Sequence, residues 1–140
     1  MLVSIDSEAA DRWLKKRDAE ELYSYVDIGG CPITSSDVRT FIDELLLRSR
    51  IKSLSEWNSG DIVLYVTVDC SPDHETTFVF STMVMLAKIE QEGRNDVVIS
   101  FRHDDQILSY GKGRKEFILE NVTTAIDKTF MKYLKANFDL

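Results

Sequence analysis

The second half of the chain alternates between apolar and polar residues in a pattern that predicts four β-strands. Residues 62–70 alternate strictly, and residues 76–89 form a longer run in which both faces are partly apolar, as in a central strand. Shorter runs follow at 97–102 and 106–111, and polar residues typical of turns separate all four runs. Because each strand follows the previous one through a short turn, we expect an antiparallel meander.

Helical spacing of apolar residues predicts two helices around these strands. Residues 115–137 place one apolar face along a long C-terminal helix. Thr34 and Asp37 match a capping box that begins an earlier helix, and Ile33 is placed to pack on Val38 across that first turn. Both helices are therefore expected to cover something hydrophobic.

The N-terminal part of the chain predicts a short helix at 7–21. Aromatic and β-branched residues gather at 22–28, which favours a strand there over the alternative, an irregular turn. Together with the runs above, these elements predict an α+β fold. Its sheet is a single open antiparallel meander of four or five strands, packed against two or three helices. The sequence contains no internal repeat or linker, so we expect residues 1–140 to form one domain.

Composition and charge limit the kinds of partner. The 140 residues carry a formal net charge of −7 at pH 7. A polyanion would be repelled on average, which argues against nucleic acid as the partner. No apolar run approaches the roughly 20 residues that span a bilayer, so no transmembrane segment is expected. We therefore expect the partner to be another protein, which includes a second copy of this chain.

The chain has two cysteines, Cys31 and Cys70, which lie far apart in the sequence. No CxxC or CxxH spacing is present, which argues against a structural zinc site. We expect two free thiols, and a disulfide is the alternative in an oxidising compartment.

Both histidines of the chain lie in polar segments that are predicted to be turns. In a meander, the turns after the first and third strands lie at the same end of the sheet. Imidazole and carboxylate groups would then gather along one rim as a divalent-metal or catalytic site. The residues of this rim are His74, His103, Asp73, Glu75, Asp104 and Asp105. The alternative, which we favour, is that they are ordinary residues of solvated turns.

A glycine-rich basic segment lies between the last predicted strand and the last helix. Its residues are Gly111, Lys112, Gly113, Arg114 and Lys115. Backbone N–H groups at such a helix start can hold a phosphate or another anion. The segment matches neither the P-loop nor the dinucleotide fingerprint, so a simple strand-to-helix turn is the favoured interpretation. No nucleophile has a recognisable catalytic context, so we assign no catalytic residue and expect no cofactor.

The order of elements from residue 33 to residue 138 resembles a class of small bacterial envelope proteins. This class includes the periplasmic domains of outer-membrane lipoproteins that assist secretion or transport. The resemblance implies a protein that acts by contact and not by chemistry. It also implies a periplasmic location if a leader has been removed, whereas the chain would otherwise be cytoplasmic.

These observations favour a non-enzymatic protein-interaction or assembly domain, which binds through a sheet face, an edge strand or a helix groove. One alternative is a small enzyme or ligand-binding protein that uses the histidine and carboxylate rim. The other alternative is a cytosolic chaperone or adaptor.

Overall fold

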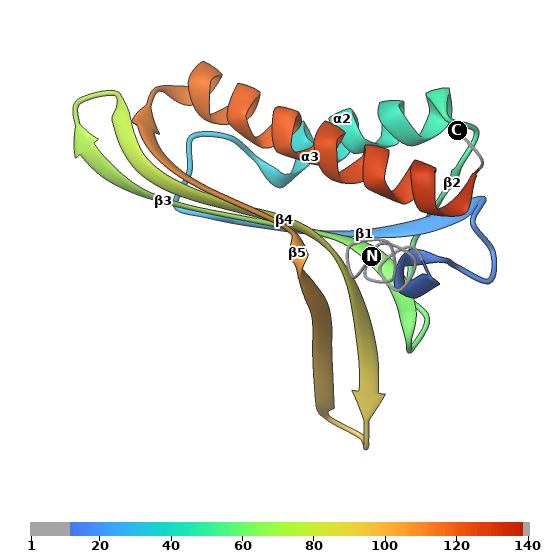
Figure 1. The fold of residues 1–140 in the computed structure, drawn as a ribbon. Helices are drawn as coiled ribbons and strands as arrows, with labels where there is room; N and C mark the ends of the chain where they lie inside the picture. The colour runs from blue at the N-terminus through green and yellow to red at the C-terminus, as the bar shows by residue number, and fades with distance from the viewer. Residues whose placement is uncertain (1–11, 139–140) are drawn as a thin grey trace, which may run out of the picture.

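The computed structural model describes residues 12–138, and Figure 1 shows a curved sheet with the long helices on one face. In chain order the elements are β1 (Glu21–Gly29), α2 (Ser35–Arg48), β2 (Lys52–Leu54), β3 (Asp61–His74), β4 (Thr77–Glu92), β5 (Asp96–Gly113) and α3 (Lys115–Asn137). The strands lie in the order β2-β1-β3-β4-β5. Among the described residues, no helix is long and apolar enough to cross a membrane.

The predicted α+β fold with a long C-terminal helix is confirmed, but the sheet is mixed and not purely antiparallel. Strands β3, β4 and β5 pair antiparallel, as predicted. Strand β1 pairs parallel with both β2 and β3. The reason is that α2 carries the chain back across the sheet after β1, so β3 starts at the same end as β1. The purely antiparallel meander was therefore wrong at this side of the sheet.

The predicted start of α2 is confirmed by its cap. The backbone N–H of Asp37 donates to Thr34 Oγ1 at 3.1 Å, and the N–H of Thr34 donates to Asp37 Oδ2 at 2.9 Å. These hydrogen bonds from Thr34 lower the pKa of the Asp37 carboxyl below its usual value. Val38, Ile42 and Leu46 then point into the core as one face.

The main core lies between the helices and one face of the sheet. It combines the even-numbered residues Ile62, Leu64, Val66 and Val68 of β3 with buried residues of both helices, such as Ile126 and Phe130 of α3. A smaller cluster lies on the opposite face and consists of Val63, Met85, Ala87 and Ile89. This two-sided burial explains why β3 and β4 contain few charged residues along their central parts.

The helix predicted at 7–21 is only partly present. Residues 12–14 are helical, the chain then runs irregularly into β1, and the start of the predicted helix lies outside the described residues. Asn137 at the end of α3 provides the physical reason. Its Oδ1 accepts from the N–H of Lys16 at 2.7 Å, and its Nδ2 donates to the carbonyl of Leu14 at 2.9 Å. Tertiary hydrogen bonds thus replace those that a longer helix would make.

The turn predicted at residues 103–105 does not form, so the last two predicted strands are one strand of 18 residues, β5. Along β5, Phe101 pairs with Ala87 and Gln106 pairs with Met85. Residues 102–105 therefore form a bulge opposite Leu86. Polar residues in a bulge resemble those of a turn, which is why the sequence pattern was misleading here.

Candidate protein-binding edge

Among residues 12–138, strand β5 lies at the edge of the sheet and pairs with β4 alone. Every second residue of such a strand presents its backbone N–H and C=O away from the sheet, where another strand can pair with them. Natural edge strands are commonly short or protected by proline and lysine. β5 is 18 residues long, has no proline and contains one lysine, Lys112. This edge is therefore open to another strand.

Exposed apolar side chains are concentrated on the same strand. Of the ten large hydrophobic residues that are exposed among residues 12–138, six belong to β5. They are Val97, Val98, Ile99, Phe101, Leu108 and Tyr110. Concentration on one strand, in contrast to scattered single residues, is typical of an interaction surface.

The outer halves of β4 and β5 form a hairpin that turns away from the rest of the sheet (Figure 1). We call residues 87–101, which include both strand segments and the connecting turn, the arm. The β4 side of the arm is held by the turn before β3. Gly60 donates its N–H to the carbonyl of Ile89 at 2.8 Å, and Gln91 donates its N–H to Ser59 Oγ at 2.9 Å. The β5 side has no such neighbour among the described residues, so its edge is the free one.

The bulge at residues 102–105 connects the arm to the packed half of the sheet, and α3 holds it in place. Lys132 Nζ donates to the carbonyl of Asp104 at 2.9 Å and lies 4.0 Å from Asp105 Oδ1. Asp105 is buried beneath this contact. The extra residues in one strand bend the ladder, which accounts for the change in direction at the base of the arm.

A groove of about 280 Å³ lies between the inner half of β5 and α3. Its lining includes Ile107, Ser109, Phe117, Asn121, Thr124 and Lys128. Ser109 Oγ donates to Asn121 Oδ1 at 2.8 Å across the groove. A groove lined by both apolar and polar side chains beside an open strand edge can hold an extended peptide.

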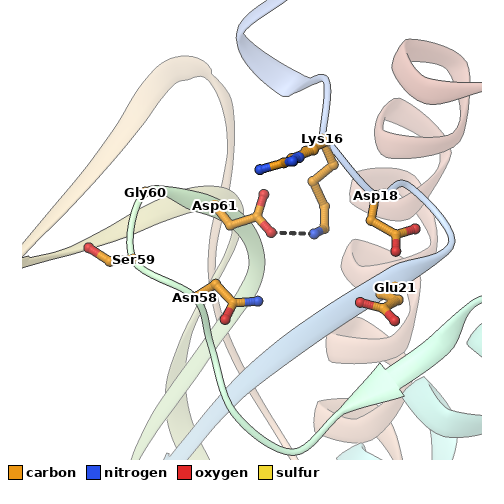
Figure 2. Close-up of a pocket in the computed structure, with 8 residues that line it drawn as sticks. Lys16, Asp18, Glu21, Asn58, Ser59, Gly60 and Asp61 are labelled. Atoms are coloured by element: carbon orange, nitrogen blue, oxygen red, sulfur yellow. Dashed lines mark hydrogen bonds and ion pairs between the residues drawn. The ribbon is translucent and has the colours of Figure 1, made fainter.

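A second hollow, of about 560 Å³, lies between the N-terminal segment and the turn before β3, as Figure 2 shows. Lys16 crosses it to form an ion pair with Asp61, and the Lys16 side chain is only 2% exposed. Nearby, Tyr133 donates its hydroxyl to the carbonyl of Ala19 at 2.6 Å, and burial raises the pKa of Tyr133. These contacts fasten the N-terminal segment to the core, so we interpret this hollow as structural.

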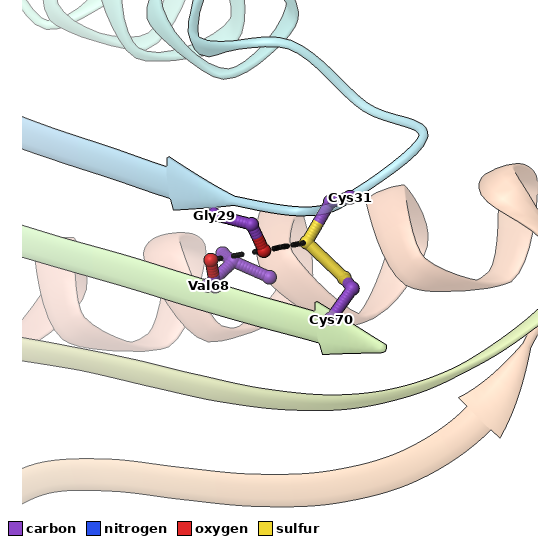
Figure 3. The surroundings of a disulfide bond; sticks show 4 residues. All are labelled: Gly29, Cys31, Val68 and Cys70. Atoms are coloured by element: carbon purple, nitrogen blue, oxygen red, sulfur yellow. Dashed lines mark hydrogen bonds between the residues drawn. A yellow bond between two sulfur atoms is a disulfide. The ribbon is translucent and has the colours of Figure 1, made fainter. Parts of the chain in front are cut away.

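Cys31 and Cys70 form a disulfide that joins the end of β1 to β3 (Figure 3). The expectation of two free thiols was therefore wrong. Gly30, which has a φ of +70°, turns the chain towards β3, and a Cβ on it would lie 2.7 Å from the carbonyl of Cys70. The sulfur of Cys31 lies 3.5 Å from the carbonyl oxygen of Gly29. A disulfide sulfur has no hydrogen to donate, so this is a close contact and not a hydrogen bond.

The structure separates the two halves of the predicted metal rim. His74, Asp73 and Glu75 lie at the end of β3, whereas His103, Asp104 and Asp105 lie in the bulge of β5. Leu86, opposite the bulge, pairs with Leu64 of β3. About ten strand residues, on the order of 30 Å, thus separate the two groups along the sheet. In the described part of the chain, no three His, Cys, Asp or Glu side chains gather to hold a metal ion. The shared rim was wrong because it required a turn at residues 103–105.

The predicted anion-binding segment lies where β5 meets α3, and its glycines have a packing role. A Cβ on Gly111 would lie 2.8 Å from the ring of Phe80, and one on Gly113 would lie 2.5 Å from the ring of Phe117. Lys112 forms an ion pair of 2.8 Å with Asp73. Arg114 and Lys115 line a nearby hollow of about 460 Å³ together with Glu75 and Glu116. Carboxylates in the lining disfavour an anion there, and binding at Gly111–Lys115 stays a prediction.

Comparison with known proteins gives structural neighbours only. No protein-family model matches the chain, and no curated protein sequence matches it. It is similar to rare lipoprotein B from Shewanella oneidensis, with a TM-score of 0.37 and 10% identity over 81% of this chain and 94% of that one. It is also similar to a minor lipoprotein from Acinetobacter baumannii, with a TM-score of 0.32 and 12% identity over 85% of this chain and 86% of that one. Both neighbours are bacterial lipoproteins, the class that the sequence pattern resembles.

Proposed function

We propose that this protein is a non-enzymatic interaction protein of the bacterial envelope that binds an extended segment of another protein along β5. The observation that carries the proposal is the free edge of the inner half of β5, which lies directly beside the groove under α3. Backbone hydrogen bonds along such an edge supply affinity, and alternate side chains of the added strand supply specificity.

The chemistry of the groove indicates what kind of segment fits. Ile107 and Ala125 offer apolar surface. Glu120 and Lys128 offer groups of opposite charge, and Asn121 offers an uncharged polar group. A segment that alternates apolar and small polar residues would point its apolar side chains into the groove and its polar ones towards solvent. The exposed ring of Phe117 at one end of the groove can pack on a further apolar side chain.

The disulfide supports a location outside the cytoplasm. Thiols are kept reduced in the cytosol of most organisms, whereas disulfides form and persist in the periplasm and at the cell surface. Cys31 and Cys70 join two neighbouring strands away from the groove, which is consistent with a structural bond. This observation favours the envelope interpretation over a cytosolic chaperone or adaptor.

Site-specific photo-crosslinking in the native organism tests the proposed edge. A photoreactive residue replaces Tyr110, which is on β5, or Leu47, which is on α2; both side chains are 78% exposed, so they form a matched pair. We expect the Tyr110 position to give a discrete adduct with a second envelope protein and the Leu47 position to give none. Equal labelling from both positions, or no adduct from Tyr110, would contradict the proposal.

A further inference from the structure

The arm carries a second pairing surface, distinct from the groove, whose sequence is complementary to itself. We infer that the arm of one protomer pairs with the arm of a second copy, antiparallel and centred on Ile99, so that one sheet continues through a homodimer. Ile99 of each copy then lies opposite Ile99 of the other. This proposal is independent of the partner segment described above, because it uses the outer half of β5 and not the inner half.

Apolar residues match around this centre. Counting outward from Ile99, Val97 lies opposite Phe101 of the second copy, and Val98 lies opposite Ser100. Val97, Ile99 and Phe101 share one face of the arm, since their partners on β4 are the odd-numbered residues Gln91, Ile89 and Ala87. Cross-strand pairs of aromatic and β-branched residues stabilise antiparallel sheets. The two exposed apolar rows would therefore lie side by side on one face of the continuous sheet at the dimer axis.

Charges match in the same register. Asp96, the first residue of β5, lies opposite Arg102 of the second copy, where the bulge begins. Within its own hairpin Asp96 pairs with Glu92, so two carboxylates face each other across the strands. Like charges in that position are destabilising, and an arginine from the second copy would compensate them. Among residues 12–138 the Nε of Arg102 is buried without a hydrogen-bond partner.

Other antiparallel registers of β5 with itself are less favourable. Pairing along the whole strand would be centred between Asp104 and Asp105 and would place these two carboxylates opposite each other. It would also require the bulge, which Lys132 holds against α3, to enter the new ladder. The register centred on Ile99 avoids the facing carboxylates and confines the regular ladder to residues 97–101, so it meets the bulge only at Arg102 and uses the part of the edge that stands clear of α3 (Figure 1). A short pairing of this kind predicts a weak dimer, with a Kd on the order of micromolar.

A charge exchange tests the register directly by sedimentation equilibrium of the full chain. Asp96→Arg places two arginines opposite each other, and Arg102→Asp places two aspartates there, so each single variant is expected to raise the dimer Kd at least tenfold. The double variant Asp96→Arg/Arg102→Asp restores opposite charges and is expected to recover most of the dimer. Circular dichroism verifies that each variant is folded.

A cysteine at the proposed axis gives a second measurement that does not depend on Arg102. Ile99→Cys brings two thiols together in the dimer and is expected to form a covalent dimer under mild oxidation. Leu47→Cys is the control, because Leu47 lies on α2 and is more exposed (78%) than Ile99 (40%), and this variant should remain monomeric on a non-reducing gel. A wild-type chain that stays monomeric into the submillimolar range would overturn the inference, as would a double exchange that fails to restore the dimer. If the chain forms no dimer but still crosslinks from Tyr110, the proposal that another protein binds along the inner half of β5 stands.

Discussion

The same two strands, β4 and β5, have different surroundings in the two halves of their length. In the inner half, Val84 and Leu86 of β4 are fully buried beneath α3, in the main core. In the arm, Ile99 of β5 belongs to an equally apolar run but is 40% exposed. The halves differ because α3 covers one face of the inner half, whereas no helix within residues 12–138 covers the arm (Figure 1). Stability and association are thus expected to depend on different halves of one hairpin.

The change between the two halves occurs at one place, the bulge, and is not a gradual loss of packing along the strands. The bulge at residues 102–105 changes the register of β5 against β4, and Lys132 of α3 binds its backbone. At the base of the arm Ala87 and Ile89 are still buried by the smaller cluster on the opposite face of the sheet. The arm is therefore anchored on its β4 side and free on its β5 side, which suits an edge that pairs with another chain.

The largest effect is expected from the core of the packed half. Phe130 of α3 is 1% exposed and stacks near Tyr133, with ring centroids 6.0 Å apart. Phe130→Ala leaves a cavity and should lower the free energy of unfolding by about 3–5 kcal/mol, measured by urea denaturation. Met131→Ala, at the neighbouring but exposed position, is the control and should change it by less than about 0.5 kcal/mol. Equal losses in both variants would show that α3 does not bury the face described here.

A smaller loss is expected when the disulfide is removed from the packed half. Cys31 and Cys70 close a loop with a sequence separation of 39. The double variant Cys31→Ser/Cys70→Ser should lower the free energy of unfolding by about 2–4 kcal/mol, because the unfolded chain gains conformational freedom. Urea denaturation of the wild-type chain with and without reductant provides the matched comparison. If reductant destabilises the serine variant as much as the wild-type chain, the disulfide is not the cause.

The parts of the fold that depend on nearby residues could be predicted from the sequence. The cap of α2 needs only Thr34 and Asp37, which are three residues apart, and both hydrogen bonds of the predicted capping box are confirmed. The buried face of α3 follows from its 3.6-residue period, and the alternation in β3 gives its two faces directly. In each of these cases the interaction that stabilises the element is encoded within the element itself.

The parts that depend on distant residues could not be predicted. The parallel pairing of β1 with β3 results from the path of α2 and leaves no local pattern. Without that pairing, Cys31 and Cys70 could not be placed together, although Gly29-Gly30-Cys31 does mark a close backbone approach. The bulge looked like a turn because the residue that holds it, Lys132, lies 28 positions from Asp104. An edge strand was predicted as one possible binding element, but the sequence does not give the strand order, which places β2 and β5 at the two edges, and only β5 carries a row of exposed apolar residues.

The smallest effect on stability is expected in the arm, at Phe101. This substitution distinguishes most clearly between the inner half of the hairpin and the arm. Phe101 is 44% exposed and pairs with Ala87, so Phe101→Ser removes a half-buried ring and should lower the free energy of unfolding by about 1 kcal/mol, less than either change above. The same change removes the side chain opposite Val97 at both ends of the proposed dimer, so the dimer should weaken although the monomer stays folded. Urea denaturation at a concentration where the wild-type chain is monomeric, together with sedimentation equilibrium, separates the two quantities. A large loss of monomer stability would mean that the arm contributes to the core, and the division of this hairpin into a stabilising half and an associating half would then be wrong.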